Sequence, residues 1–339
     1  MKSIILRVQE RIKNLREYIP TMKRNKFYLL LLMMIFLFSG CMRNDNNTTT
    51  SKETESTITK DSTSAKAINN DSTEESPEES AVKLSDFINP EGNTLFTRFI
   101  TPKGYKRVEA AKGSFVDFIG NYPLEPDGTT VYYFDKREKS GDGHAAVFSM
   151  EVGEEDLQQC ADSIMRIYAE YLYKSGNEDK ISFKFVDGFV CDYNHWKQGY
   201  RVKFVDDKPY WDKKTDADNS EETFKKYLRI VFAYSSTLSM ENESKPVDMS
   251  ELKVGDIFIK GGSPGHVVMV ADICENESGE KAFLLAQGFM PAQSFHIIKN
   301  PAHSEDPWYY ESEVKYPFRT QSYTFDEGSL RRPNYLDWQ

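Results

Sequence analysis

Three side chains of the kinds that cysteine hydrolases use follow one another along the chain, namely Cys160, His266 and Gln287. A thiol near a helix N-terminus has its thiolate stabilised by the helix dipole. An imidazole within hydrogen-bond reach removes the thiol proton and later returns it, and a third polar group orients that imidazole. We therefore expect Cys160 as nucleophile, His266 as base and Gln287 as orienting residue, with Gln159, or its neighbour Gln158, as an oxyanion donor.

Each of these residues also has a purely structural interpretation. Cys160 lies on an apolar helical stripe, and free cysteine is among the most buried residue types. His266 follows Pro264 and Gly265, so it can simply close a tight turn. Gln287 at a strand end can equally cap that strand. Asp272 is excluded as the orienting group, because six residues of extended strand place it about 20 Å from His266.

The elements expected to position these residues form an α+β fold, with one long helix packed on an antiparallel sheet. Apolar residues at three- and four-residue spacing predict a helix over 157–173 with Asp156 as its N-cap, and a second over 221–235. Short apolar runs separated by turn residues predict three late strands. The strands are expected at 256–260, 266–273 and 282–287, with earlier ones at 129–134 and 145–152.

This order of cysteine helix, histidine strand and polar strand end resembles the papain-like core of the NlpC-type cell-wall cysteine peptidases. In that family a stretch similar to Gly255-Asp256-Ile257-Phe258 precedes a strand similar to His266-Val267-Val268-Met269-Val270. The sequence departs from the family around the thiol, where Gln159-Cys160-Ala161-Asp162 replaces an Asp-Cys-Ser context. The resemblance implies a papain-like cysteine hydrolase that cleaves an amide or peptide bond in cell-wall material.

An aromatic cluster between the two expected helices suggests a different function. Aromatic faces bind sugar and peptide surfaces, so these side chains can line a groove for peptide or glycan. The alternative is that they fill the core. The groove candidates are Tyr193, Trp196, Tyr200 and Trp211. A third possibility is a structural or assembly component with no small ligand.

The remaining cysteines and histidines carry weaker signals. Three cysteines follow Cys41, and the pairing that leaves Cys160 free is Cys191 with Cys274. Cys191 and His195 have helical spacing, but two ligands are a weak metal signal. We therefore expect no metal and no cofactor.

The N-terminal region predicts export and lipidation. Basic residues precede twelve apolar residues, 27–38, and then Phe38-Ser39-Gly40-Cys41. Twelve helical residues span about 18 Å, too short for a bilayer core of about 30 Å. The pattern resembles a signal peptide with a lipobox over residues 1–41, with Met22 as the favoured start and Cys41 lipidated. An uncleaved anchor is the alternative.

The rest of the chain divides into a tether and a folded part. Residues 42–83 hold fifteen Ser or Thr and five Asn. Such a stretch cannot bury enough apolar surface to fold, so it predicts a disordered tether. Residues 84–339 have the composition of a single globular domain. The expected location is the cell envelope, where the lipid at Cys41 binds the bilayer and cell-wall peptide or glycan is the expected ligand.

Charge and motifs exclude other classes of function. The chain has 339 residues and a net charge of −10, and the first 26 residues carry eight basic and two acidic side chains. The remainder is therefore strongly acidic, which argues against nucleic-acid binding, because such binding needs cationic surface. No P-loop, dinucleotide fingerprint or zinc-ligand pair occurs.

Several longer strings resemble the bacterial lipoprotein family of the domain of unknown function 4846. The match spans most of residues 95–330 and departs from the family near 320–323. The resemblance implies a lipoprotein with one folded domain and carries no established activity. The matching strings are Asp156-Leu157-Gln158-Gln159-Cys160-Ala161-Asp162-Ser163, Trp196-Lys197-Gln198-Gly199-Tyr200-Arg201, Gly261-Gly262-Ser263-Pro264-Gly265-His266 and Ala286-Gln287-Gly288-Phe289-Met290-Pro291-Ala292-Gln293.

Overall fold

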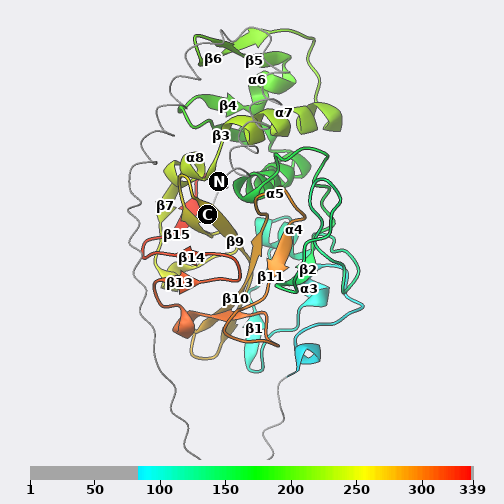
Figure 1. Cartoon of the computed structure of the whole chain (residues 1–339), viewed down its shortest axis with the longest axis vertical. Helices are drawn as coiled ribbons and strands as arrows, with labels where there is room; N and C mark the ends of the chain where they lie inside the picture. Colours follow the sequence, from blue (N-terminus) through cyan, green and yellow to red (C-terminus); the bar gives the residue numbers. More distant parts are fainter. Residues whose placement is uncertain (1–82, 337–339) are drawn as a thin grey trace, which may run out of the picture. The chain divides into compact units, whose positions relative to one another are not determined.

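A computed structural model of the protein describes residues 83–336 (Figure 1). The expected signal peptide, Cys41 and all of the tether except Lys83 lie outside these residues. Within 83–336, no helix combines the length and apolar character needed to cross a bilayer. The described part mixes helices with antiparallel sheet, and sheet predominates. The predicted α+β class is confirmed at this level.

The main sheet contains nine strands, and every pair in it is antiparallel. Its central strands alternate with turns along the chain: β8 (Ile257–Lys260), β9 (His266–Asn276) and β10 (Lys281–Gln287). The order is β2-β11-β10-β9-β8-β15-β7, with β1 beside β9 and β12 beside β10. The other strands of this sheet are β1 (Tyr105–Arg107), β2 (His144–Val147), β7 (Ser244–Pro246), β11 (His296–Ile298), β12 (Tyr309–Tyr310) and β15 (Leu330–Pro333).

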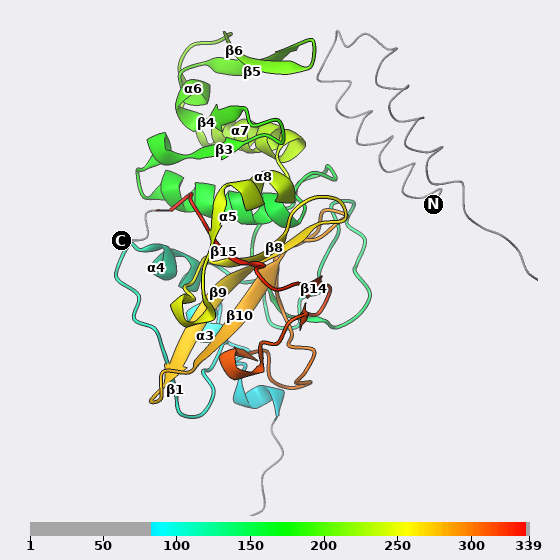
Figure 2. The same cartoon turned by 90° about the vertical axis from the view of Figure 1, so that its left-hand side faces the viewer.

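Three two-stranded hairpins lie outside this sheet. They pair β3 (Ser182–Lys184) with β4 (Val190–Asp192), β5 (Tyr200–Val205) with β6 (Lys208–Lys213), and β13 (Phe318–Arg319) with β14 (Thr324–Phe325). Figures 1 and 2 show β3–β6 at one end of the molecule, on the far side of α5 (Cys160–Lys174) from the main sheet.

Two helices of similar length dominate the helical part, at the two places where helices were expected, so no one long helix stands out as the predicted fold class had it. The helix α5 has 15 residues and packs on β9, and α7 (Glu221–Tyr234) has 14 residues. Ser220 caps α7 through its hydroxyl, which accepts from the N–H of Thr223. The shorter helices are α3 (Leu95–Arg98), α4 (Phe115–Gly120), α6 (Tyr193–Lys197) and α8 (Thr237–Asn242).

The predicted start of the first long helix was wrong by three residues. The helix begins at Cys160 with Gln159 as N-cap, not at 157 with Asp156 as N-cap. The carboxylate of Asp162 accepts from the N–H of Gln159 and closes the first turn, and Asp156 bonds instead to the Gln159 amide and to the N–H of Ala292. This shift puts the thiol in the first position of the helix.

The late strands and the second helix were predicted well, and the early strands were not. The three runs predicted over 256–287 appear as β8, β9 and β10, and 221–235 appears as α7. The strand expected over 145–152 is shorter and becomes β2. The strand expected over 129–134 forms isolated bridges, Tyr132 with Glu138 and Tyr133 with Gln293.

Two buried polar contacts tie these elements together. The hydroxyl of Tyr168 on α5 donates to the carbonyl of Gly255 at 2.6 Å, directly before β8. Asp256, which is fully buried, accepts two hydrogen bonds from the Arg332 guanidinium of β15, at 2.7 and 2.8 Å. The turn that leads into β8 is therefore held from both sides, which sets the position of β9 beside it.

Asp272 on β9 makes the stability of the fold depend on pH. This carboxyl is 1% exposed and lies 2.8 Å from the Arg107 guanidinium of β1. Burial raises its pKa to about 6, against the opposing charge of Arg107. A folded-state pKa above the unfolded value means that the stabilising contribution is complete below about pH 4 and is lost as the pH rises through about 6.

We expect the free energy of unfolding to lose about 2–3 kcal/mol from this group between pH 4 and 7. Urea unfolding across that range measures the slope. The variant Asp272→Asn cannot titrate there, so its stability should vary less with pH, whatever its absolute value. An unchanged slope in this variant would contradict the assignment.

Candidate active site

Cys160 is the first residue of α5, and although the residue as a whole is only half-buried, its thiol is desolvated. Burial of the sulfur and the Asp162 carboxylate raise its pKa to about 12, although the backbone N–H groups of Ala161, Val267 and Cys160 itself act in the opposite direction. At neutral pH the group is therefore a protonated thiol. It needs a base before it can act as a nucleophile.

The backbone N–H of Val267, at the start of β9, is near enough to this thiol to lower its pKa. Val267 follows His266, so the start of β9 lies near the Cys160 thiol, across about a hundred residues of chain. Among the described residues, no hydrogen bond joins the thiol to the His266 ring in this state. Catalytic hydrogen bonds are often long before substrate binds, so this geometry is compatible with a nucleophile and a base.

Gly265 and Gly288 allow the segments next to His266 and Gln287 to pack closely against their neighbours. A side chain at Gly265, just before His266, would lie 2.4 Å from the carbonyl oxygen of Gly262. A side chain at Gly288, just after Gln287, would lie 2.4 Å from the Ser163 hydroxyl and 2.8 Å from the carbonyl oxygen of Gln159. The loop that follows β10 therefore packs against the first turn of α5, which brings Gln287 and Cys160 to the same region.

His266 and Gln287, the expected base and orienting residue, are joined by a hydrogen bond. Nε2 of His266 lies 2.8 Å from Oε1 of Gln287, and both side chains are buried. The amide nitrogen of Gln287 contacts His296 Nε2 at 3.3 Å and donates to the Ser322 hydroxyl at 3.1 Å. Nδ1 of His296 lies 2.8 Å from the carbonyl oxygen of Ser294. These contacts form one hydrogen-bonded network, which runs from His266 through Gln287 to His296 and Ser322.

This hydrogen-bonded network determines which nitrogen of the His266 ring is free to accept a proton. Burial lowers the pKa of His296 to about 3, so its ring is neutral, and its Nδ1 must donate to the Ser294 carbonyl. Nε2 of His296 is then an acceptor, which turns the Gln287 amide nitrogen towards it and the Gln287 oxygen towards His266. His266 therefore carries its proton on Nε2 and leaves Nδ1 as the basic atom.

Aromatic side chains surround the His266 ring and exclude water from it. The ring centre lies 4.7 Å from that of Phe289, 5.1 Å from Tyr323 and 6.1 Å from Phe325. Burial lowers the His266 pKa to about 4; the Gln287 hydrogen bond opposes this effect, and the ammonium of Lys139 adds to it. The imidazole is therefore neutral, and able to accept a proton, above about pH 4.

The expected oxyanion donor is engaged elsewhere. The Gln159 amide donates to Asp156 Oδ1 at 2.9 Å. The Gln158 amide oxygen accepts from Arg166 at 2.7 Å, and its nitrogen contacts the Met150 sulfur. The first backbone N–H groups of α5 are donors near the sulfur, because the first turn of a helix leaves such groups without helical partners, and the N–H of Val267 is another.

The proposed aromatic groove is only partly available. Tyr193 and Trp196 are buried, at 0% and 3% exposure, and Trp196 donates to the carbonyl of Thr223. Tyr200 and Trp211 are half-buried, and both contact the exposed ring of His195. Two of the four candidates therefore belong to the core and cannot line an open groove.

The other cysteines take no part in this region. Cys191 and Cys274 are both buried and free, so the disulfide considered from the sequence does not form. The ring of His195 pairs with Asp192 instead of joining Cys191. Within residues 83–336, no group of three or more His, Cys, Asp or Glu side chains is arranged to hold a metal ion.

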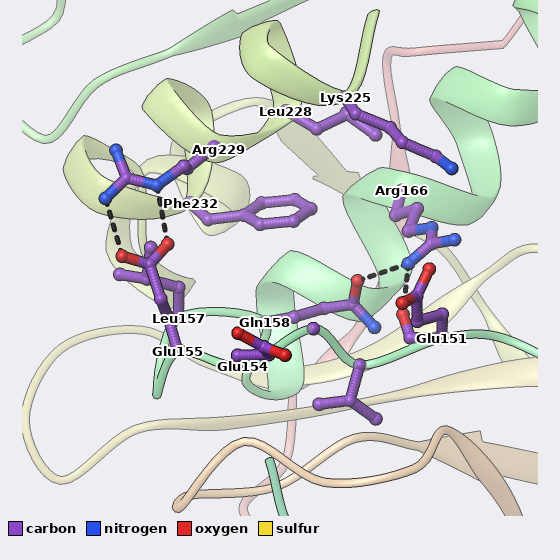
Figure 3. Close-up of a pocket in the computed structure, with 12 residues that line it drawn as sticks. Glu151, Glu154, Glu155, Leu157, Gln158, Arg166, Lys225, Leu228, Arg229 and Phe232 are labelled. Atoms are coloured by element: carbon purple, nitrogen blue, oxygen red, sulfur yellow. Dashed lines mark hydrogen bonds and ion pairs between the residues drawn. The ribbon is translucent and has the colours of Figure 1, made fainter. Parts of the chain in front are cut away.

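A separate pocket of about 200 Å³ lies between α7 and the segment before α5 (Figure 3). Neither Cys160 nor His266 lines it. Its two guanidinium groups already have internal partners: Arg229 forms two hydrogen bonds with Glu155, and Arg166 donates to Gln158 and to the carbonyl of Glu151 (Figure 3). This pocket therefore offers no nucleophile, and both of its guanidinium groups are already engaged.

Sequence reasoning missed three members of the region, namely His296, Ser322 and Lys139. His296 and Ser322 contact Gln287 directly. His296 was detectable in principle, because it lies opposite Gln287 in the β10–β11 pair. Ser322 and Lys139 had no such signal, since neither lies on a strand that pairs with the strand of Gln287.

Comparison with known proteins identifies the chain by family alone. The model of a family described as a domain of unknown function (4846) matches residues 95–332. No curated protein and no solved structure matches the chain.

Proposed function

We propose that this chain, which belongs to the family of the domain of unknown function 4846, is an envelope-anchored cysteine hydrolase with a papain-like arrangement of catalytic residues. Its reaction would be cleavage of an amide or peptide bond in cell-wall material. The observation that carries the proposal is the hydrogen-bonded network of His266, Gln287 and His296. It leaves the His266 imidazole neutral, with Nδ1 as its basic atom, in the region of the Cys160 thiol. Anchoring through a lipid on Cys41 completes the proposal.

The proposed reaction uses His266 twice. Nδ1 takes the proton of the Cys160 thiol as the sulfur attacks the substrate carbonyl carbon, and the carbonyl oxygen becomes an oxyanion. The imidazolium then gives this proton to the leaving amine as the C–N bond breaks, which leaves a thioester on Cys160. Water attacks the thioester, His266 accepts a proton from that water, and the carboxylic acid product leaves with the thiol restored.

The electrostatics favour a neutral pair over a preformed ion pair. The high pKa of Cys160 and the low pKa of His266 both favour thiol and neutral imidazole in the resting state. The proton would then move only as the substrate is attacked, with the N–H groups at the start of α5 stabilising the developing negative charge. Gln287 would act as a positioning residue through its bond to His266 Nε2.

Alkylation of Cys160 by iodoacetamide tests this proposal without a known substrate. We expect Cys160 to react in the native protein, and the variant His266→Ala to react at least about tenfold more slowly, because the thiol loses its base. The wild-type rate should fall as the pH is lowered towards about 4, where His266 takes up a proton. Peptide mass spectrometry identifies the modified cysteine.

The buried residues Cys191 and Cys274 are internal controls in the same molecule, and both should stay unmodified until the protein unfolds. The variant His303→Ala removes a histidine from the surface and should leave the rate at Cys160 unchanged. The proposal is wrong if Cys160 resists alkylation in the native state, or if it reacts equally fast without His266.

The observations favour the enzyme over a glycan- or peptide-binding protein with an aromatic groove. Two of the four groove candidates are core residues, and Trp211 stacks on His195, which itself pairs with Asp192. A binding protein would also have no use for a basic nitrogen kept neutral in the region of a thiol at a helix N-terminus.

A further inference from the structure

Lys139 is a cation in the surroundings of the His266 ring, and it lacks a counterion. It ends a hairpin over residues 131–139, in which its N–H donates to the carbonyl of Val131. Its side chain is half-buried, and among the described residues it has no carboxylate within ion-pair distance and no side-chain hydrogen bond. Burial lowers its pKa, as expected for an ammonium that has lost water without gaining an anion.

The hairpin is fastened to the segment that links Gln287 to His296. The N–H of Phe134 donates to the carbonyl of Ala292, and the N–H of Ser294 donates to the carbonyl of Tyr132, at 2.9 and 2.8 Å. Lys139 is therefore held against the loop that follows β10. It does not extend freely into solvent.

Phe289 connects this ammonium to the proposed base. Nζ of Lys139 lies 5.7 Å from the centre of the Phe289 ring, and the centre of the His266 ring lies 4.7 Å from that same ring centre. The ammonium is thus no farther from the imidazole centre than the sum of these two distances. Its charge lowers the pKa of His266, His144 and His296, so its electrostatic field acts on all three rings.

A second unsatisfied group lies on the neighbouring segment. Gln293 is 1% exposed, and neither its amide oxygen nor its amide nitrogen has a hydrogen-bond partner among the described residues. Its backbone pairs with Tyr133 of the hairpin. A buried amide without partners is costly, as is an ammonium without an anion.

We propose that Lys139 binds a carboxylate of the substrate, and that the substrate is a short peptide with a free carboxylate close to the bond that is cleaved. The separation from His266 corresponds to at most about three residues of extended peptide, at about 3.3 Å a residue. This inference rests on the proposed hydrolase function, since it identifies the substrate class of the same site. Phe289 and Lys139 are both partly exposed, so a ligand can reach them.

Binding to a variant that cannot turn over tests the inference separately from catalysis. The probes are N-acetylated di- and tripeptides of D-alanine, each prepared as the free acid and as the carboxamide. In full-length protein carrying Cys160→Ala, calorimetry should show the acid binding about tenfold more tightly than the amide, as expected for one charge-assisted contact. Adding Lys139→Gln should bring the ratio of the two affinities to about one.

Lys136→Gln is the matched control, because it removes the same charge from an exposed position of the same hairpin. It should keep the preference for the acid. Equal affinities for acid and amide, no binding of either, or a preference that survives Lys139→Gln would each overturn the inference. If the preference depends on Lys139 but alkylation of Cys160 does not depend on His266, the carboxylate site stands and the hydrolase proposal falls.

Discussion

Replacing Cys160 with alanine is expected to lower the rate of amide hydrolysis by at least about 10³-fold, because the variant has no atom that can form the thioester. The substrate is purified cell-wall peptide, and the assay follows new amino groups and the mass of the released fragments. The fold should survive, since removal of one sulfur from a half-buried residue costs about 1 kcal/mol of stability. Thermal unfolding of the same samples separates loss of chemistry from loss of structure.

Cys191→Ala is the control that distinguishes a catalytic sulfur from a merely buried one. Cys191 is fully buried on β4, so its replacement leaves a cavity and should cost more stability than the change at Cys160. Its activity per folded molecule should remain that of the wild type. Full hydrolysis by Cys160→Ala would show that this thiol only packs, as the apolar stripe around it allows.

The second large effect is on stability, and it concerns the buried pair of Arg332 and Asp256. Replacing Arg332 with methionine leaves the Asp256 carboxylate without its charged partner in a fully buried position. We expect a loss of about 3–5 kcal/mol in the free energy of unfolding, measured by urea denaturation at pH 7. Because Asp256 starts the turn into β8, the loss should spread to the whole sheet and not remain local.

Two further variants show whether burial is the cause of this effect. Lys226→Met breaks an exposed pair with Glu222 on α7 and should cost no more than about 0.5 kcal/mol. The double change Asp256→Leu with Arg332→Met removes both charges and should recover much of the lost stability. A loss in Arg332→Met as small as that in Lys226→Met would contradict the assigned role of the pair.

Sequence reasoning succeeded where burial of the apolar residues in a local pattern stabilises one structure enough to exclude the others. The late strands have continuous apolar runs between turn residues, and burying such short runs leaves few secondary structures other than a strand. These strands are 257–260, 266–276 and 281–287. The helix at 221–234 has an apolar stripe, acidic residues in its first turn and a serine cap. The hydrogen bond between His266 and Gln287 followed from the same strand assignments.

The start of α5 was mispredicted because apolar periodicity continues past its true end. Leu157 fits the stripe, but the first turn is closed by the Asp162 carboxylate on the N–H of Gln159, and Gly288 packs against that turn. Asp156 was a reasonable cap by residue type. Its carboxylate instead accepts from Ala292, a residue 136 positions away, so no local signal could reveal its role.

The sequence alone therefore determined the class of fold, the acidic character of the body and which thiol, imidazole and amide were worth considering, because composition and short-range periodicity depend on neighbours along the chain. The tertiary structure decided the protonation of His266, the inclusion of His296 and the proximity of Lys139. Those properties arise from burial and from contacts between residues far apart in sequence, where hydrogen bonds and desolvation set which atom holds a proton.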